Sequence, residues 1–385
     1  MLVPRLRPFA STIFAEMTAL AVRTGAVNLG QGFPDTDGPV GMLAKASEAI
    51  LGGVNQYPPG PGMPELRAAV AEHRRDRYGH TYDPDTEVLI TVGATEAISA
   101  ALLALTQPGD EVIVIEPYYD SYPAAVALAG ATRRVVSLRE SGSGRFELDI
   151  DALRAAVTPA TRLILLNSPH NPTGTVFTRQ ELAAVAALCV EHELLAVTDE
   201  VYEHLTYDCE HLPLAGFPGM ASRTLTVSSA GKTFNCTGWK IGWACGPAPL
   251  VAATRATKQF LTFVGGAPFQ PAVAHALRNE LDWVAGLRKG LQSKRDRLSE
   301  GLTAAGFAVR PTAGTYFVCA DVRPLGFEDG AEFCWALPAA AGVAAVPVQV
   351  FTDNPGPWRH LVRFAFCKKG EVLDEAITRL AGLRA

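Results

Sequence analysis

Seven short apolar runs alternate with helix-like segments between residues 87 and 246, and this alternation constrains the fold more than any other feature of the sequence. Many of the runs are rich in Val, Ile and Leu, as strands buried on both faces are. They are Glu87–Thr91, Glu111–Ile115, Arg134–Leu138, Arg162–Asn167, Leu195–Thr198, Thr224–Ser228 and Ile241–Cys245. The pattern predicts an α/β fold: a three-layer sandwich in which helices cover a mostly parallel, seven-stranded sheet.

The helical segments carry recognisable N-terminal signals. They are Glu65–Tyr78, Thr95–Thr106, Asp149–Val157 and Arg179–His192. Thr178 and Glu181 have the spacing of a capping box, in which each side chain binds a free backbone N–H group at the helix start. The basic residues Arg74, Arg75 and Arg77 lie on the first segment, and we interpret them as a solvated helix face.

The pattern changes after Pro268, which predicts a second, smaller α+β domain. A long helical stretch covers residues 270–305, and strand candidates follow at Tyr316–Ala320, Val343–Val346 and Leu361–Phe366, with helices near Ala331–Ala341 and Glu371–Leu383. We expect residues 1–40 to form an N-terminal arm and part of the small domain. Residues 41–270 would form the large domain, and residues 271–385 the small C-terminal domain with its long connecting helix.

Charge and cysteine usage exclude several classes of function. The net charge of −5 provides no basic field for nucleic acid. The sequence has no run of about 18 apolar residues, so we expect no membrane segment. The seven cysteines show neither Cys-x-x-Cys pairs nor zinc spacing. Reduced thiols in a cytoplasmic protein without a metal site are the expectation.

Lys232 lies just past the apolar run Thr224–Ser228, in the region where ligands bind in parallel α/β proteins. The tripeptide Gly231-Lys232-Thr233 resembles the end of a nucleotide-binding phosphate loop, but that loop requires glycine where Thr226 stands. A single lysine is most often an exposed surface residue. A catalytic interpretation therefore depends on what the other loops place around it.

The loops after the other runs supply matching chemistry. Gly93, Ala94 and Thr95 open a helix, where free backbone N–H groups favour a phosphate. An aromatic ring, two amides and a carboxylate follow the next runs, at Tyr119, Asn167, Asn171 and Asp199. Pyridoxal 5′-phosphate requires a lysine, an acid for its pyridine nitrogen and a phosphate cup.

The order of these motifs makes the chain similar to the class I and II aminotransferases of fold type I. The matching segments are Asn167–Gly174, Thr198–Tyr202, Ser228–Gly242 and Val362–Phe364. The resemblance implies pyridoxal 5′-phosphate bonded to Lys232, with Asp199 holding the pyridine nitrogen protonated. It implies ring contacts from Tyr202, Asn171 and Tyr119, and a phosphate cup of Gly93, Ala94, Thr95, Ser229 and Lys240. It further implies that Arg363 binds the substrate α-carboxylate with Asn167 beside it.

The resemblance also implies a homodimer with shared active sites, because Tyr57 matches a tyrosine that reaches the phosphate of the neighbouring subunit. Lys240 departs from the usual pattern, since most class I enzymes carry arginine there. Lysine at this position is a feature of the branch that contains glutamine–phenylpyruvate, kynurenine and cysteine-conjugate enzymes.

The partners implied are small-molecule substrates, an amino acid and a 2-oxo acid. Side-chain contacts in this branch match Gly32, Phe33, Tyr118 and Phe14, and Phe263 from the other subunit. The segments Asn28–Asp35, Gly53–Gly62, Tyr202–Leu205 and Val264–Pro271 most resemble actinobacterial N-succinyldiaminopimelate aminotransferases. We interpret Gly265 and Gly266 as leaving room for that substrate, with glutamate as amino donor.

Three alternatives remain open. An aromatic pocket would suit a glutamine, methionine or kynurenine-type aminotransferase. A β-lyase acting on cysteine S-conjugates would use the same residues. A cofactor-binding regulator would need an additional helix-turn-helix domain, and the enzyme-like motifs already begin at residue 28, so we expect no such domain.

Overall fold

The structure is a computed structural model, and it describes residues 2–384. Its main sheet has seven strands in the order β2-β10-β9-β8-β7-β3-β4. The strands are β2 (Val88–Thr91), β3 (Glu111–Glu116), β4 (Thr132–Ser137), β7 (Thr161–Asn167), β8 (Leu195–Asp199), β9 (Thr224–Ser229) and β10 (Gly242–Cys245). Only β10 among them runs antiparallel to its neighbours. The predicted mostly parallel, seven-stranded sheet is confirmed.

Helices cover both faces of the sheet, because alternate strand residues point into two different cores. Val112 and Val114 face the core beneath α4 (Gly93–Leu105), α5 (Ser121–Ala129) and α9 (Ala248–Lys258). Ile113 and Ile115 face the opposite core beneath α6 (Ile150–Ala156) and α7 (Arg179–Glu191). The predicted capping box of Thr178 and Glu181 is present at the start of α7.

A third apolar cluster joins three further helices to the β2–β10 edge of the sheet. They are α2 (Val40–Leu51), α3 (Pro64–Tyr78) and α10 (Phe269–Asn279). On α3, Arg75 and Arg77 are exposed, but Arg74 is fully buried. The interpretation of all three as a solvated face is therefore wrong for Arg74, which lies one helical turn after the buried Val70.

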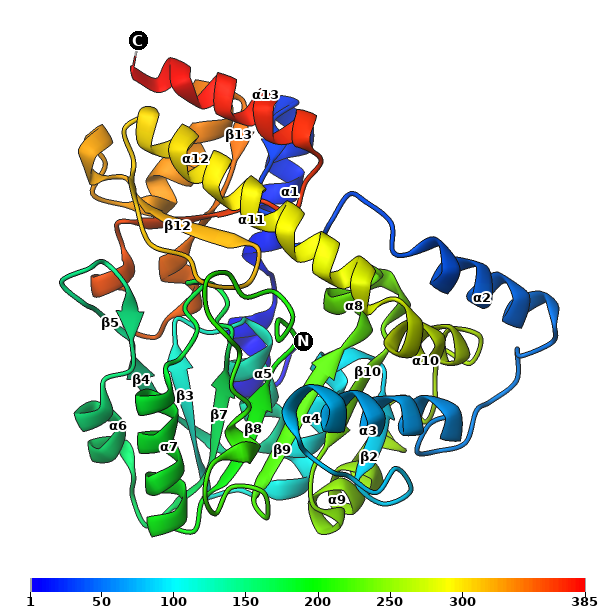
Figure 1. Ribbon diagram of the computed structural model, residues 1–385. Coiled ribbons are helices and arrows are strands. Elements are labelled where there is room, and N and C mark those ends of the chain that lie inside the picture. Colours follow the sequence, from blue (N-terminus) through cyan, green and yellow to red (C-terminus); the bar gives the residue numbers. More distant parts are fainter. Residues whose placement is uncertain (1, 385) are drawn as a thin grey trace.

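The predicted continuous helix over residues 270–305 is wrong. Glu280 has non-helical dihedral angles (φ −118°, ψ 18°) and separates α10 from α11 (Leu281–Ala304). Helix α10 packs against α2 and α3, whereas α11 packs against α13 (Gly370–Ala381). In Figure 1, α11 runs from the neighbourhood of the main sheet to the other end of the molecule.

The second part, which we call the small lobe, comprises residues 281–384 with α1 (Ile13–Thr24) and β1 (Val27–Asn28). Its four-stranded sheet has the order β11-β12-β15-β14. The strands are β11 (Ala308–Val309), β12 (Phe317–Asp321), β14 (Val346–Pro347) and β15 (Leu361–Ala365). Helix α12 (Gly330–Ala341) and α13 lie beside it at the top of Figure 1. The remainder of the described chain, with the seven-stranded sheet, is called the large lobe.

The N-terminal segment packs into the small lobe. Strand β1 pairs with β13 (Val343–Ala344), and α1 packs against α12 and β13. The predicted strand Val343–Val346 is thus divided, since β13 pairs with β1 and β14 pairs with β15. A separate hairpin joins β5 (Arg139–Glu140) and β6 (Phe146–Glu147). No helix in residues 2–384 combines the length and apolar character needed to cross a bilayer.

Candidate active site

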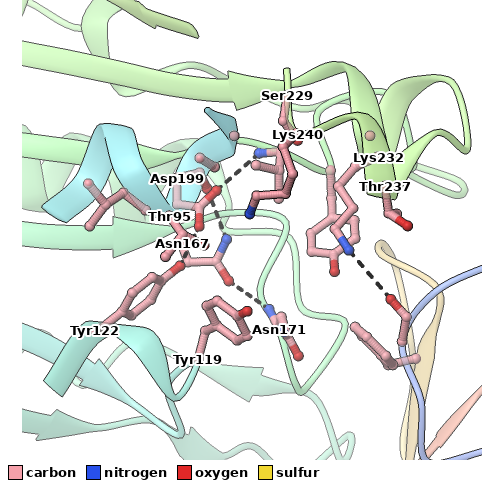
Figure 2. A pocket seen from close by; sticks show the side chains of 18 of the residues that line it. Thr95, Tyr119, Tyr122, Asn167, Asn171, Asp199, Ser229, Lys232, Thr237 and Lys240 are labelled. Carbon is pink, nitrogen blue, oxygen red and sulfur yellow. Dashed lines mark hydrogen bonds between the residues drawn. The ribbon is translucent and has the colours of Figure 1, made fainter. Parts of the chain in front are cut away.

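A cavity of about 330 Å³ lies where the predicted site loops converge (Figure 2). The parallel strands β3, β7, β8 and β9 end on the same side of the sheet, which brings the loops after them together. The predicted residues that line the cavity are Phe14, Gly32, Gly93, Ala94, Thr95, Tyr119, Asn167, Asn171, Asp199, Tyr202, Ser229, Lys232, Lys240 and Arg363. Residues more than 300 positions apart in the sequence therefore share one site.

Lys232 lies on the short helix α8 (Ala230–Thr233), immediately after β9. Its Nζ donates a hydrogen bond to Tyr316 Oη at 2.7 Å and a longer one to the main-chain oxygen of Gly32 at 3.4 Å. Burial lowers the pKa of Lys232 to about 8, although the nearby Asp199 carboxylate acts in the opposite direction. Near neutral pH the neutral, nucleophilic form of this amine is therefore far more populated than in an ordinary lysine, whose pKa lies near 10.5.

Asp199 ends β8 and turns its carboxylate into the cavity. It accepts a 2.6 Å hydrogen bond from Tyr122 Oη and a 3.3 Å bond from the main-chain N of Val201. Burial raises the pKa of Asp199, and these hydrogen bonds act against it. Within residues 2–384 no basic side chain forms an ion pair with this carboxylate. A cationic ligand group would compensate the buried charge.

The two asparagines connect Asp199 to Arg363. Asn167 donates from Nδ2 to the main-chain oxygen of Asp199 (2.9 Å) and accepts at Oδ1 from the main-chain N of Asn171 (2.7 Å). Arg363 donates from Nη1 to Asn171 Oδ1 at 2.9 Å. Asn171, rather than Asn167, is thus the residue hydrogen-bonded to the arginine. Asn167 is connected to Arg363 through Asn171.

Arg363 comes from β15 of the small lobe and is buried among aromatic rings. Its Cζ lies 3.9 Å from the Phe317 ring centroid and 5.2 Å from that of Phe14. Nη2 donates to the main-chain oxygen of Gly30, and Nε has no hydrogen-bond partner within the described residues. A buried N–H group without a partner is unfavourable, so this guanidinium is suited to bind a planar acceptor such as a carboxylate.

The N-terminus of α4 and Lys240 form a cationic pocket at one end of the cavity. Gly93 has φ +75°, and a Cβ atom there would lie 3.2 Å from Lys240 Nζ. A Cβ atom at Gly242 would lie 2.6 Å from the Gly93 carbonyl carbon. These glycines therefore let the helix start, the lysine and β10 approach closely. Figure 2 shows Thr95, Ser229 and Lys240 near one another at this end. Backbone N–H groups with a lysine form an anion site.

Four predicted contact residues do not line the cavity. The rings of Tyr57 and Phe263 are 81% and 51% exposed, and their centroids lie 5.4 Å apart. Phe33 is about half exposed, while its neighbour Gly32 does line the cavity. Tyr118 is buried and donates to Asp353 at 2.6 Å.

The structure adds residues that the sequence reasoning missed. Tyr122 hydrogen-bonds Asp199, and Tyr316 hydrogen-bonds Lys232. Tyr122 lies at the start of α5 and Tyr119 lies just before that helix, so the closeness of the two tyrosines in the sequence was the signal that could have found it. Tyr316 lies 84 residues from its partner, and no local signal connects them. Gln31, Thr237 and Phe317 also line the cavity.

A separate group of metal-ligand type lies outside the cavity. Ligand atoms of His73, Glu203 and His204 lie within 4.8 Å of one another. Both Glu203 oxygens already have partners, because Oε2 binds Arg74 at 2.8 Å and Oε1 accepts from Ser228 at 2.6 Å. The Nε2 atoms of the two histidines are 3.0 Å apart, a hydrogen-bond distance. We therefore describe the group as a buried polar network.

Comparison with known proteins places the chain among enzymes of one family. The family model for aminotransferase class I and II matches residues 24–380. A probable N-succinyldiaminopimelate aminotransferase, DapC, of Mycobacterium tuberculosis is 62% identical, covering 100% of this chain and 98% of that protein. The methionine aminotransferase of Escherichia coli is 39% identical over 98% of this chain and 97% of its own length.

Solved structures agree with this assignment. The N-succinyldiaminopimelate aminotransferase from M. tuberculosis superposes with a TM-score of 0.98 at 63% identity, covering all of both chains. The aspartate aminotransferase from Thermus thermophilus with maleate superposes with a TM-score of 0.92 at 35% identity, covering 100% of this chain and 99% of that one.

Proposed function

Because this chain belongs to the class I and II aminotransferases, we propose that it transfers an amino group between N-succinyl-L,L-2,6-diaminopimelate and 2-oxoglutarate, the reaction of lysine biosynthesis. The observation that carries an aminotransferase site is the low-pKa amine of Lys232, which shares one cavity with Asp199 and Arg363. The substrate choice rests on 62% identity, over the whole chain, to a probable N-succinyldiaminopimelate aminotransferase.

We propose pyridoxal 5′-phosphate as the cofactor, because the cavity residues fit each of its parts. The buried Asp199 carboxylate has no ion-pair partner among residues 2–384 and suits a protonated pyridine nitrogen. The glycine-lined start of α4 with Lys240 suits a phosphate. The Tyr119 ring lines the same cavity and suits a flat heterocycle. When bound, the cofactor supplies a conjugated ring that withdraws electrons from the substrate α-carbon.

The protein residues would divide the remaining work. Arg363 would bind the substrate α-carboxylate, using the guanidinium edge that includes the unpartnered Nε. Lys232 would hold the resting cofactor covalently, and its neutral amine, once free, would accept the substrate α-proton and deliver it to the cofactor carbon. Tyr316 and Gly32 hold Nζ on the cavity side where this proton moves. Tyr202, whose ring centroid lies 5.2 Å from that of Tyr316, would donate to the phenolic oxygen of the cofactor.

The structure gives Gly265 and Gly266 a different role from the one that the sequence suggested. A Cβ atom at Gly266 would lie 2.2 Å from Ile241 Cδ1, and one at Gly265 would lie 2.9 Å from Val92 Cγ2. These glycines therefore permit close packing against the pocket wall, rather than leaving space for a substrate. The basic residues lining the cavity are Lys232, Lys240 and Arg363, and each already has a proposed role.

A panel of amino acceptors tests the proposed substrate. With cofactor-loaded protein and glutamate as donor, we expect kcat/KM for N-succinyl-2-amino-6-ketopimelate to exceed the values for phenylpyruvate and the keto acid of methionine by about tenfold or more. Kynurenine as donor and a cysteine S-conjugate complete the panel. A preference for the methionine or aromatic keto acids would instead favour the aminotransferase alternatives, and release of pyruvate and ammonia would identify a β-lyase.

We propose that the enzyme is a homodimer with shared active sites, located in the cytoplasm. The exposed Tyr57 and Phe263 rings contact each other, with the exposed Phe260 close by in the chain. Clustered exposed aromatic residues are typical of an interface. The reduced state of all seven cysteines suits a reducing compartment.

Light scattering should give a mass of about twice 40.9 kDa. Tyr57→Phe should leave that mass unchanged and weaken cofactor binding about 10- to 100-fold, because a hydrogen bond to a charged phosphate is lost. Trp335→Ser, a change at an exposed aromatic residue on α12, serves as the control. A monomer with full cofactor affinity would refute the shared site.

A further inference from the structure

The turn after β8 presents two sets of side chains in opposite directions. Asp199, Val201 and Tyr202 line the cavity. Glu200 and Glu203 do not line it and are almost completely buried behind the turn, at 2% and 0% exposure. The position of the cavity residues therefore depends on what holds these two glutamates.

One guanidinium holds both glutamates. Arg74 of α3 donates from Nη1 to Glu203 Oε2 at 2.8 Å and from Nη2 to Glu200 Oε2 at 3.1 Å. Arg74 is fully buried, and its Cζ lies 4.5 Å from the Tyr78 ring centroid. Burial acts against its charge, but the two carboxylates raise the pKa of Arg74 above its ordinary value. The arginine is thus a fixed cation in the protein interior.

The same glutamates connect the turn to the neighbouring strands. Glu203 accepts from Ser228 of β9 at 2.6 Å, and Ser229 of the cationic pocket follows directly. Glu200 accepts from Thr198 Oγ1 at 3.0 Å and lies 3.0 Å from His211 Nε2. A shift of either glutamate would therefore move the ends of β8 and β9, which carry cavity residues.

We propose that Arg74 is a positioning residue for the amino-transfer reaction. It bridges Glu200 and Glu203 and thereby fixes the orientation of Asp199 and Tyr202 toward the cofactor. The inference rests on the proposed function. A planar guanidinium can donate to two carboxylates in fixed directions, which a lysine ammonium cannot do with the same geometry. The positive charge also offsets two carboxylates next to Asp199, whose own negative charge must remain available for the cofactor.

The variant Arg74→Lys tests the proposal, because it keeps the positive charge and removes the planar guanidinium that donates to two carboxylates. We expect kcat to fall about 10- to 100-fold with little change in KM for the amino donor, since small displacements of reacting groups have effects of this size. Cofactor affinity should fall about tenfold. The pH at which the visible absorbance of the bound cofactor is half changed, which we call the spectral midpoint, should differ from that of the wild-type protein. In the apoprotein, amide hydrogen exchange of residues 199–206 should accelerate.

Arg145→Lys is the matched control. Arg145 also donates to a partly buried carboxylate, Glu181 at 2.6 Å, but Glu181 lies at the start of α7 and neither residue lines the cavity. This variant should lower the unfolding temperature while preserving kcat, cofactor affinity and the spectral midpoint. If Arg74→Lys behaves in the same way as this control, Arg74 is only structural and the proposal is wrong.

A second variant covers the outcome in which Arg74→Lys does not fold. Arg74→Met combined with Glu200→Gln and Glu203→Gln removes the cation together with both carboxylates that it binds, so neither glutamate is left charged and buried without its arginine. We expect a folded protein with reduced kcat and a shifted midpoint, and unaltered values would contradict the proposal. Wild-type protein that fails on the acceptor panel would overturn the proposed function. The exchange and cofactor-affinity measurements would still decide whether Arg74 positions the turn.

Discussion

Replacing Lys232 with alanine is expected to reduce kcat by about 10⁴-fold or more, the largest effect of any single change in this chain. The substitution removes both the proposed covalent bond to the cofactor and the group that we propose moves the α-proton. Cofactor should still bind non-covalently, because the pocket around Lys240 and the Asp199 carboxylate remain. Kinetics and the absorbance spectrum of the bound cofactor measure the two effects separately.

The control for this variant is Lys45→Ala, which removes an exposed lysine paired with Glu48 on α2. That protein should retain wild-type turnover. A fully active Lys232→Ala variant would refute the site assignment. In the apoprotein, Lys232 should react with acetic anhydride at half its maximal rate near pH 8, because burial lowers its pKa to about that value. The rate should rise as the pH increases, because the neutral amine is the nucleophile.

Asp199→Asn is expected to produce the second largest loss, about 10²- to 10³-fold in kcat with weaker cofactor binding. The amide has the shape of the carboxylate and can still accept from Tyr122, but it carries no charge to keep a pyridine nitrogen protonated. Stopped-flow kinetics and equilibrium cofactor titration report the two effects.

Tyr122→Phe distinguishes the charge of Asp199 from its hydrogen bond. Removing the hydroxyl that lies 2.6 Å from Asp199 should reduce kcat by only about 2- to 10-fold, the usual range for one hydrogen bond. Equal losses in both variants would mean that orientation of the carboxylate, rather than its charge, dominates. Unchanged kinetics in Asp199→Asn would contradict its proposed role.

Strand positions could be predicted because buried parallel strands have an almost uniformly apolar composition. Val112–Ile115 and Leu163–Leu166 are examples, since both faces of the sheet are covered. The break at Glu280 could not be predicted in the same way. It follows from α10 packing on α2 and α3 while α11 continues to the small lobe, and neither contact is local in the sequence.

The sequence could predict which residues share the cavity where a residue lies at the end of a strand or shortly after it, as Asp199 and Lys232 do. It could do so less well where packing between distant segments decides the contact. Tyr316 reaches Lys232 from the small lobe, and Arg363 meets Asn171 rather than Asn167. Arg74 is an opposite case, because its charged neighbours in the sequence suggested solvent exposure while two buried glutamates determine its position.

The cavity is walled by both lobes, and this has a consequence for the lifetime of the folded molecule. Arg363 and Phe317 come from the small lobe, while Asp199 and Lys232 come from the large lobe. A ligand that fills the space contacts both, so its binding free energy also opposes separation of the lobes. Cofactor supply would then control resistance to heat and proteolysis as well as turnover, and the unloaded chain would be the form most readily degraded.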